Sequence, residues 1–204
     1  MECALRKLGL SFESNMADLA VRRATYEDIL QAPPEKVAEV IEGVLYVHPR
    51  PASPHALAAS SLGMDLGTPF QRGRGGPGGW WIVFEPELHL GSEPDIVVPD
   101  LAGWRRERMP QYPKTAFVEV APDWVCEVPS ESTRRLDRVE KMRIYAREGV
   151  QHVWLIDPIV ETIEAFGFDG TTYRVVAAHG GDERPRLEPF DAIELDLAAL
   201  WGRQ

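Results

Sequence analysis

The middle of the chain has the clearest pattern of hydrophobic and polar positions. Residues 124–128 and 153–156 are short apolar runs, typical of buried strands. Between them apolar residues recur every three positions, which predicts an amphipathic helix that begins at Ser132 or Thr133 and ends at Gly149. Its inward positions are Leu136, Val139, Met142 and Tyr145. This stretch therefore predicts a strand, a helix and a second strand in succession.

The opposite face of that helix is basic. It carries Arg134, Arg135, Arg138, Lys141 and Arg147. The simplest interpretation is a solvated face, in which Asp137 and Lys141, four residues apart, form an ion pair. The same arginines are also the best candidates in this sequence for contacting phosphate groups.

The N-terminal part predicts a short helix, a hairpin and a longer helix. Residues 25–30 begin with Thr25 and Asp28 in a capping-box arrangement and stop before two prolines. Glu42-Gly43 separates two β-branched runs, which indicates a hairpin. A helix is expected over residues 55–72. Its inward positions are Leu57, Leu62 and Leu66.

Further apolar runs indicate strands on both sides of the central stretch. The expected strands are residues 80–90, 95–98, 117–120, 162–168 and 172–177. Asp169-Gly170 is a strong hairpin signal between the last two. Residues 103–114 are polar and are predicted to form an exposed loop. The C-terminal residues, IELDLAALW, fit either a last strand or a short helix.

Length and composition indicate one soluble domain. The chain has 204 residues, 44% of them hydrophobic, which suits a single domain over residues 16–204. Residues 1–15 precede a more natural start at Met16 and are expected to be a disordered extension. No apolar stretch is long enough to span a membrane, and no signal peptide is evident. With two cysteines and no disulfide framework, we expect a cytoplasmic protein.

The charge restricts the function. The net charge of −10 and the pI near 5.0 argue against a protein that simply coats DNA, because phosphate binding requires a positive surface. An enzyme whose basic residues cluster at the entrance of its active site is still compatible with this net charge. Part of the acidic excess would then serve as metal ligands.

Two acids and a lysine are the candidate chemistry. Glu127 lies where the strand at 124–128 ends, Asp95 begins the apolar run at 95–98, and Lys141 lies on the following helix. Phosphodiester hydrolysis needs an activated water and a charge that neutralises the phosphate, both of which Mg²⁺ supplies when carboxylates hold it. A nearby lysine can orient the water or stabilise the transition state. The long separation of Asp95 from Glu127 makes spacing alone weak support.

The full set of motifs resembles the Uma family, restriction-endonuclease-like proteins of the PD-(D/E)XK nuclease superfamily. The motifs are Glu93-Pro94-Asp95-Ile-Val-Val, Val-Cys-Glu127-Val-Pro-Ser130, Asp137-x-x-x-Lys141-x-x-x-Tyr145 and Val-Trp154-Leu-Ile-Asp157-Pro158. Residues 38–43 and Ser-Pro-His55 also resemble the N-terminal part of that family. The resemblance covers roughly residues 25–200.

This resemblance implies a restriction-endonuclease-like α/β core, with a mixed central sheet flanked by helices. Asp95 would supply the PD acid and Glu127 the second acid, and both would bind Mg²⁺ or Mn²⁺. Pro129 stands where the superfamily has its lysine, so the lysine would be Lys141, brought back from the helix. Glu39 matches the N-terminal acid found near such sites. The substrate would be DNA, and a homodimer would suit double-strand cleavage.

Structural roles compete with these assignments. Arg134 could neutralise Glu127, Lys141 could pair only with Asp137, and Glu39 could belong to a hairpin salt bridge. His55 is expected to cap or pack a helix, and Tyr145 to lie in the core. Two other functions therefore stay open: a catalytically silent nucleic-acid or protein-interaction module, and a metal-dependent hydrolase of another substrate. Arginines around the acids would favour DNA, whereas a site ringed by acids would favour the hydrolase.

Overall fold

The computed structural model describes residues 22–203, so the predicted extension at residues 1–15 lies outside it. The larger of its two sheets has six strands in the order β10-β9-β8-β7-β6-β3. They are β3 (Trp80–Phe84), β6 (Leu101–Arg105), β7 (Trp124–Glu127), β8 (His152–Asp157), β9 (Thr162–Phe168) and β10 (Tyr173–Gly180). β7 and β8 run parallel and the other neighbours antiparallel. The sheet is therefore mixed, as the resemblance to the Uma family implies.

A smaller antiparallel sheet has the order β2-β1-β5-β4. Its strands are β1 (Lys36–Ile41), β2 (Val44–Pro49), β4 (Leu88–Leu90) and β5 (Asp95–Val97). β1 and β2 form the predicted hairpin, in which Glu42 and Gly43 have φ angles of 52° and 79°. The left-handed conformation is unfavourable for Glu42, and the Asp95 carboxylate supports it by accepting the Glu42 N–H at 2.5 Å.

Helices connect and cover these sheets. They are α1 (Tyr26–Leu30), α2 (Ser53–Leu66) with its continuation η1 (Gly67–Gln71), the π-helical segment η2 (Leu136–Lys141) with its continuation α3 (Met142–Arg147), and α4 (Leu197–Leu200). The capping box of α1 is present, with the Thr25 N–H donating to Asp28 at 2.7 Å. Gly149, at φ 71°, ends the central helix as predicted. The C-terminal residues form the short helix.

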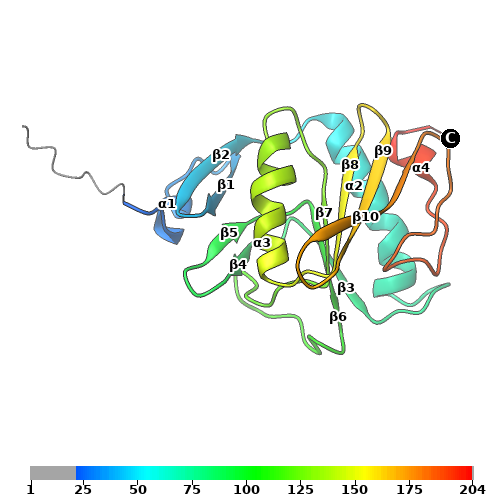
Figure 1. Ribbon diagram of the computed structural model, residues 1–204, viewed down its shortest axis with the longest axis horizontal. Helices are drawn as coiled ribbons and strands as arrows, with labels where there is room; N and C mark the ends of the chain where they lie inside the picture. Colours follow the sequence, from blue (N-terminus) through cyan, green and yellow to red (C-terminus); the bar gives the residue numbers. More distant parts are fainter. Residues whose placement is uncertain (1–21, 204) are drawn as a thin grey trace, which may run out of the picture.

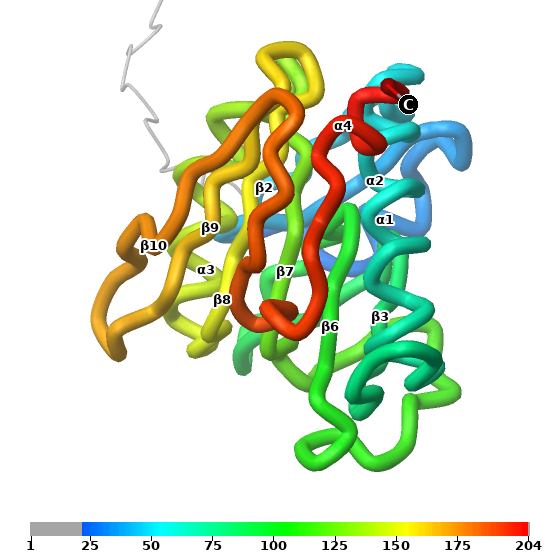
Figure 2. Tube along the Cα trace, turned by 90° about the vertical axis from the view of Figure 1, so that its right-hand side faces the viewer, coloured from blue at the N-terminus to red at the C-terminus, as the bar shows by residue number. Residues whose placement is uncertain are grey.

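The six-stranded sheet separates two hydrophobic cores. α2 and α4 cover one face, and α3 covers the other, where the smaller sheet also packs (Figures 1 and 2). Alternate residues of each strand enter opposite cores: Cys126 and Trp154 face α2, whereas Val125 and Leu155 face α3. The strand–helix–strand unit predicted from residues 124–156 therefore forms the centre of the fold.

Several sequence predictions of local structure are wrong. Residues 80–90 form β3 and β4, which belong to different sheets. Residues 117–120 make only one isolated bridge, between Leu88 and Val118. Leu57 is 43% exposed and Val139 is 36% exposed, so neither residue is the inward position of its helix that the sequence predicted. The largest error concerns the loop predicted at 103–114, since its first residues belong to β6, which pairs with β3 on one side and β7 on the other.

Gly103 explains why β6 looks like a loop in the sequence. A Cβ at this position would lie 3.1 Å from the Trp124 ring, 3.2 Å from Ile82 and 3.3 Å from the Trp80 ring. The glycine therefore marks a close approach of aromatic rings to a strand and not a turn. The polar residues Arg105 and Arg106, which follow Gly103, also make this strand resemble an exposed loop in the sequence.

We expect Gly103→Ala to lower the free energy of unfolding by about 1–3 kcal/mol, because the added methyl group overpacks buried rings. Gly67→Ala is the matched control: no atom lies within 4 Å of its Cβ position, and alanine favours the helix by up to about 1 kcal/mol. Urea unfolding of both variants tests this. Equal effects of the two substitutions would contradict the packing argument.

Within residues 22–203, no helix has the length and hydrophobicity needed to cross a bilayer.

Candidate active site

Two acids meet where β6 begins and β7 ends. The antiparallel register pairs Leu101 with Cys126, so Asp100, just before β6, and Glu127, the last residue of β7, are next in the same ladder. Both have the strand parity of residues that face the α3 core. Asp100 is held in place by the backbone N–H of Val128, which donates to its Oδ2 at 2.7 Å. Asp100, which the sequence analysis did not single out, is thus the acid beside Glu127.

Asp95, the predicted metal ligand, belongs to a different environment. Its Oδ2 accepts from the Arg147 guanidinium at 2.8 Å, and its Oδ1 accepts from the Glu42 N–H. It begins β5 in the smaller sheet and does not line the cavity described below. The structure therefore brings Glu39, Glu127 and Lys141 together, as predicted, but does not bring Asp95 to them. Asp95 stabilises the β1–β2 turn and the end of α3.

Lys141 lies at the centre of a buried acidic cluster. Its Nζ is 2.9 Å from Glu39 Oε1, 3.1 Å from Asp137 Oδ1 and 3.4 Å from Glu127 Oε1. The Lys141 side chain is only 4% exposed, so its assignment to a solvated face is wrong. The predicted pair with Asp137 is confirmed, but it is one contact of three. The π-helical turn η2 contains both residues, and such wide turns are common at functional sites.

The elements around the cluster fix its other members. Glu39, on β1, also accepts the Val98 N–H at 2.7 Å, which ties it to the end of β5. Tyr145, on α3, donates its hydroxyl to Glu127 Oε1 at 2.5 Å. Tyr145 is buried as predicted, but its hydroxyl makes it a functional neighbour of Glu127 as well as a core residue. The signal for this role was its four-residue spacing from Lys141.

Burial and charge perturb the acidity of these groups strongly. Burial raises the pKa of Glu127 well above its usual range, and the neighbouring carboxylates of Asp137, Asp100 and Glu39 raise it further, against the effect of Lys141. Burial alone would lower the pKa of Lys141, but Glu127, Glu39 and Asp137 together raise it well above its usual value. Lys141 is therefore an ammonium, and the raised pKa of Glu127 means that its carboxyl group gives up its proton at a higher pH than an exposed glutamate does.

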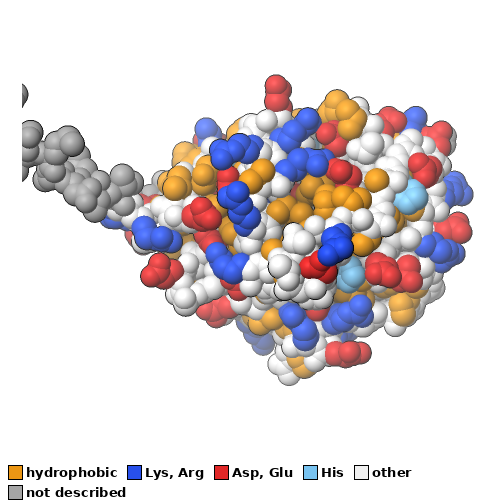
Figure 3. Space-filling view, viewed as in Figure 1, with side chains coloured by type: hydrophobic (Ala, Val, Ile, Leu, Met, Phe, Trp, Pro, Cys, Tyr) orange, Lys and Arg blue, Asp and Glu red, His pale blue; other side chains and the backbone are white. Residues whose placement is uncertain are grey.

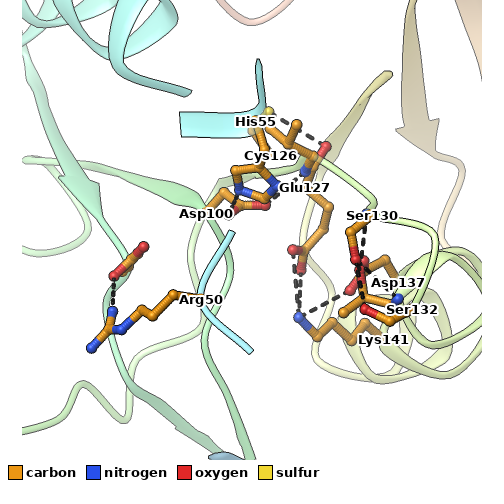
Figure 4. A network of polar contacts seen from close by, with 12 residues as sticks. Arg50, His55, Asp100, Cys126, Glu127, Ser130, Ser132, Asp137 and Lys141 are labelled. Atoms are coloured by element: carbon orange, nitrogen blue, oxygen red, sulfur yellow. Dashed lines mark hydrogen bonds and ion pairs between the residues drawn. The ribbon is translucent and has the colours of Figure 1, made fainter. Parts of the chain in front are cut away.

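These side chains line one small cavity of about 60 Å³. Its ionisable lining residues are Glu39, His48, His55, Glu85, Asp100, Glu127, Asp137 and Lys141. Figure 4 shows the Lys141 ammonium pointing at Glu127 and Asp137, with His55 above Asp100. The volume suffices for an ion and a few water molecules. Carboxylates outnumber the one lysine in this lining, so the cavity suits a cation.

The donor set fits a hard divalent cation. Carboxylate oxygens are what Mg²⁺ and Mn²⁺ prefer, and Mg²⁺ is usually held by only one or two of them. Across residues 22–203, no group of three or more His, Cys, Asp or Glu side chains is already arranged around one point. The oxygens of Asp100 and Glu127 are instead engaged by His55, Val128, Tyr145 and Lys141. An ion bound by Asp100 and Glu127 would therefore be completed by water or substrate.

The arginines of the central helix are mostly paired with acids. Figure 3 shows basic side chains along the face that contains α3. Their partners are Asp157 for Arg134, Glu140 for Arg135 and Arg143, Glu164 for Arg138, and Asp95 for Arg147. Arg134 thus pairs with Asp157 and not with Glu127. The helix presents a solvated, largely neutralised face.

A second arginine group lies away from the cavity. In the described chain, none of Arg72, Arg74, Arg105, Arg106 and Arg108 lines it. Arg105 ends β6, whereas Asp100 precedes its start, a separation of roughly 17 Å along the strand. Arg106 packs over the Trp81 ring and donates to the Gln71 carbonyl oxygen. These arginines therefore do not form the cluster around the acids that would have favoured a DNA substrate.

The raised pKa of Glu127 predicts an unusual dependence of stability on pH. A carboxyl whose pKa is higher in the folded than in the unfolded protein stabilises the fold below its unfolded pKa, near 4.3, and loses this contribution as the pH rises through its folded pKa. With EDTA present, the free energy of unfolding should therefore fall above pH 5. One such group contributes at most about 1.4 kcal/mol per pH unit.

Glu127→Gln should remove the contribution of Glu127 to this pH dependence of the free energy of unfolding. Glu140→Gln is the control, because Glu140 pairs with exposed arginines on the same helix. Chemical unfolding between pH 5 and pH 9 measures both variants against wild type. Parallel curves for wild type and Glu127→Gln would contradict the raised pKa.

The sequence contained a signal for Asp100 that was missed. Pro94-Asp95 and Pro99-Asp100 are two Pro-Asp pairs five residues apart, and each precedes an apolar run. The first run, Ile-Val-Val, has the stronger β-propensity. The second, Leu-Ala-Gly-Trp, is nevertheless the strand that pairs with β7.

Comparisons with known proteins agree with this fold. Residues 23–198 match the sequence model of the Uma2 family, described as "Putative restriction endonuclease". A crystal structure from Anabaena variabilis, described as a "putative nuclease belonging to DUF820", superposes with a TM-score of 0.69 at 21% identity. The match covers 87% of this chain and 97% of the other. No curated protein matches the sequence.

Proposed function

This chain belongs to the Uma2 family and has a restriction-endonuclease-like fold, and we propose that it is a divalent-metal-dependent nuclease that hydrolyses phosphodiester bonds in DNA. The observation that carries this proposal is the meeting of Asp100, Glu127, Glu39 and Lys141 in one cavity, where β6 begins and β7 ends. Acids and a lysine in this arrangement are the parts that phosphoryl chemistry requires. The nuclease-related descriptions of the family and of the similar structure support the same conclusion.

Asp100 and Glu127 are the proposed ligands of Mg²⁺ or Mn²⁺. Pro99-Asp100, and not Pro94-Asp95, then supplies the PD acid, because Asp100 lies beside Glu127 and Asp95 is bound by Arg147. A bound ion supplies a nucleophilic water and neutralises charge on the phosphate. Tyr145 orients Glu127 through its hydroxyl, and Glu39 holds Lys141 in the cavity.

Lys141 provides a permanent positive charge at this site. It stays protonated because three carboxylates surround it. When it exchanges one of its three carboxylate contacts, its ammonium can donate to a phosphate oxygen or to the attacking water, which stabilises the charge that develops in the transition state. Pro129 occupies the position at which the superfamily motif has its lysine. Lys141 can take over that role because η2 places its Nζ 3.4 Å from Glu127 Oε1.

A metal-dependent hydrolase of a smaller phosphodiester is the second candidate. The acidic lining of the cavity and the position of Arg105 outside that lining are the observations that support this candidate. A homodimer and a cytoplasmic location stay predictions from the sequence.

The test of both candidates is a cleavage assay with full-length protein and Mg²⁺, Mn²⁺ or EDTA. The substrates are supercoiled plasmid, single-stranded DNA and bis(p-nitrophenyl) phosphate. The nuclease proposal expects metal-dependent cleavage of DNA and none by Glu127→Gln. Cleavage of the small diester alone would favour the second candidate. No metal-dependent cleavage of any of the three substrates would contradict both.

A further inference from the structure

We propose that His55 is a positioning residue that holds Asp100 for metal binding. This inference rests on the proposed function, because it assigns Asp100 to the metal. It differs from the capping or packing role that the sequence favoured for His55. Three observations carry it: the contact of His55 with Asp100, the way in which Asp100 is clamped, and the place of His55 in the fold.

The contact is direct and its donor can be assigned. His55 Nε2 lies 2.5 Å from Asp100 Oδ1. A carboxylate oxygen accepts hydrogen bonds, so Nε2 must carry the proton. The other ring nitrogen, Nδ1, is buried without a hydrogen-bond partner in the described chain. The imidazole is therefore committed to Asp100 through one nitrogen.

Asp100 is clamped from two sides. Val128 N–H donates to Oδ2, and His55 donates to Oδ1. Each oxygen accepts one hydrogen bond and keeps a lone pair that could face a cation. Both donors are oriented by regular structure, since Val128 follows β7 and His55 lies in the first turn of α2. The carboxylate plane is thereby fixed without consuming its ligating capacity.

His55 is held in place by its position at the start of α2. Pro54 precedes it in the first turn of α2, where proline preorganises the helix. α2 packs on the face of the six-stranded sheet opposite to α3. His55 therefore anchors Asp100 to one layer of the fold, while Lys141 and Tyr145 anchor Glu127 from the other layer. Hydrogen-bonded partners of ligating groups typically change metal affinity about 10–100-fold when they are removed.

The experiment measures Mn²⁺ affinity of the full chain by calorimetry, for wild type, His55→Asn, His55→Gln and Asp100→Asn. Glutamine can place its amide N–H where Nε2 lies, but asparagine is one methylene too short. We expect His55→Asn to weaken binding about 10–100-fold and His55→Gln to recover most of it. A packing role would not distinguish the two amides in this way. His89→Gln is the control, because His89 contacts Glu87 outside the cavity.

The outcomes separate the two proposals. Wild-type affinity in His55→Asn, with binding lost in Asp100→Asn, would overturn the role of His55 and leave the metal site intact. Unchanged affinity in Asp100→Asn, or no Mn²⁺ binding by wild type, would overturn the metal site at Asp100 and the inference with it. Equal weakening by both His55 variants would show that the imidazole acts through its packing and would also overturn the inference.

Discussion

Lys141→Met should lower the free energy of unfolding by about 3–5 kcal/mol, the usual cost of removing one partner from a buried ion pair. Methionine preserves the side chain as far as its ε position but leaves Glu39, Asp137 and Glu127 without their cation. Nζ lies 2.9, 3.1 and 3.4 Å from these carboxylates, so the substitution removes three close ion-pair contacts. Urea unfolding at pH 8, where the uncompensated charge is largest, measures the effect.

The same substitution separates stability from catalysis. Arg143→Met is the matched control, since Arg143 pairs with Glu140 on the exposed side of the same helix and such pairs contribute about 0–1 kcal/mol. Lys141→Met should still bind Mn²⁺, because Asp100 and Glu127 are retained, but cleavage should fall about 10²-fold or more. If Lys141→Met lowered the free energy of unfolding by less than about 1 kcal/mol, the prediction that the buried acids depend on Lys141 would be wrong.

Asp100→Asn should reduce DNA cleavage by at least about 10²–10³-fold, the range observed when an electrostatic catalytic group is removed. Asparagine is isosteric, so it keeps the Val128 N–H contact through its carbonyl oxygen but removes the negative charge that a cation requires. Initial cleavage rates with saturating Mg²⁺ measure this effect.

Asp95→Asn is the control for that variant and should behave in the opposite way. Its carboxylate receives Arg147 and the Glu42 N–H, so the substitution should cost about 1–3 kcal/mol of stability and leave the cleavage rate within a few-fold of wild type. If Asp95→Asn abolished cleavage in a folded protein while Asp100→Asn did not, the assignment of Asp100 would be wrong.

Local patterns predicted the centre of this fold well. The apolar run ending at Glu127, the helical periodicity through Tyr145 and the stop at Gly149 each depend on neighbours in sequence. The structure has the strand, the helix and the helix end that they predict, although Val139 is exposed. The hairpin turns at Glu42-Gly43 and Asp169-Gly170 are likewise encoded locally. These elements needed no knowledge of the rest of the chain.

The errors arise where tertiary packing overrides the local pattern. β6 contains Gly103 because aromatic rings press against it, a reason that lies in β3 and β7. Lys141 belongs to a face that appears basic and solvated, but the acids that bury it come from β1, β7 and its own helix. Glu39 and Glu127 are 88 residues apart in number, so only their resemblance to a family motif suggested that they meet.

Asp100 shows how a local sequence pattern can be present while its role depends on the pairing of distant strands. The family resemblance assigned the PD acid to Pro94-Asp95, and the second Pro-Asp pair, Pro99-Asp100, was not considered. Strand register decides between them, because Leu101 pairs with Cys126, and pairing of distant strands is not visible in either segment alone.

The central claim is that Asp100 and Glu127 share one divalent cation. Calorimetric titration of Mn²⁺ into wild type, Asp100→Asn, Glu127→Gln and Asp95→Asn tests it most directly. We predict one micromolar-to-millimolar binding event in wild type and Asp95→Asn, and its loss in both other variants. Binding that survives in Asp100→Asn and Glu127→Gln, or that disappears only in Asp95→Asn, would contradict the claim.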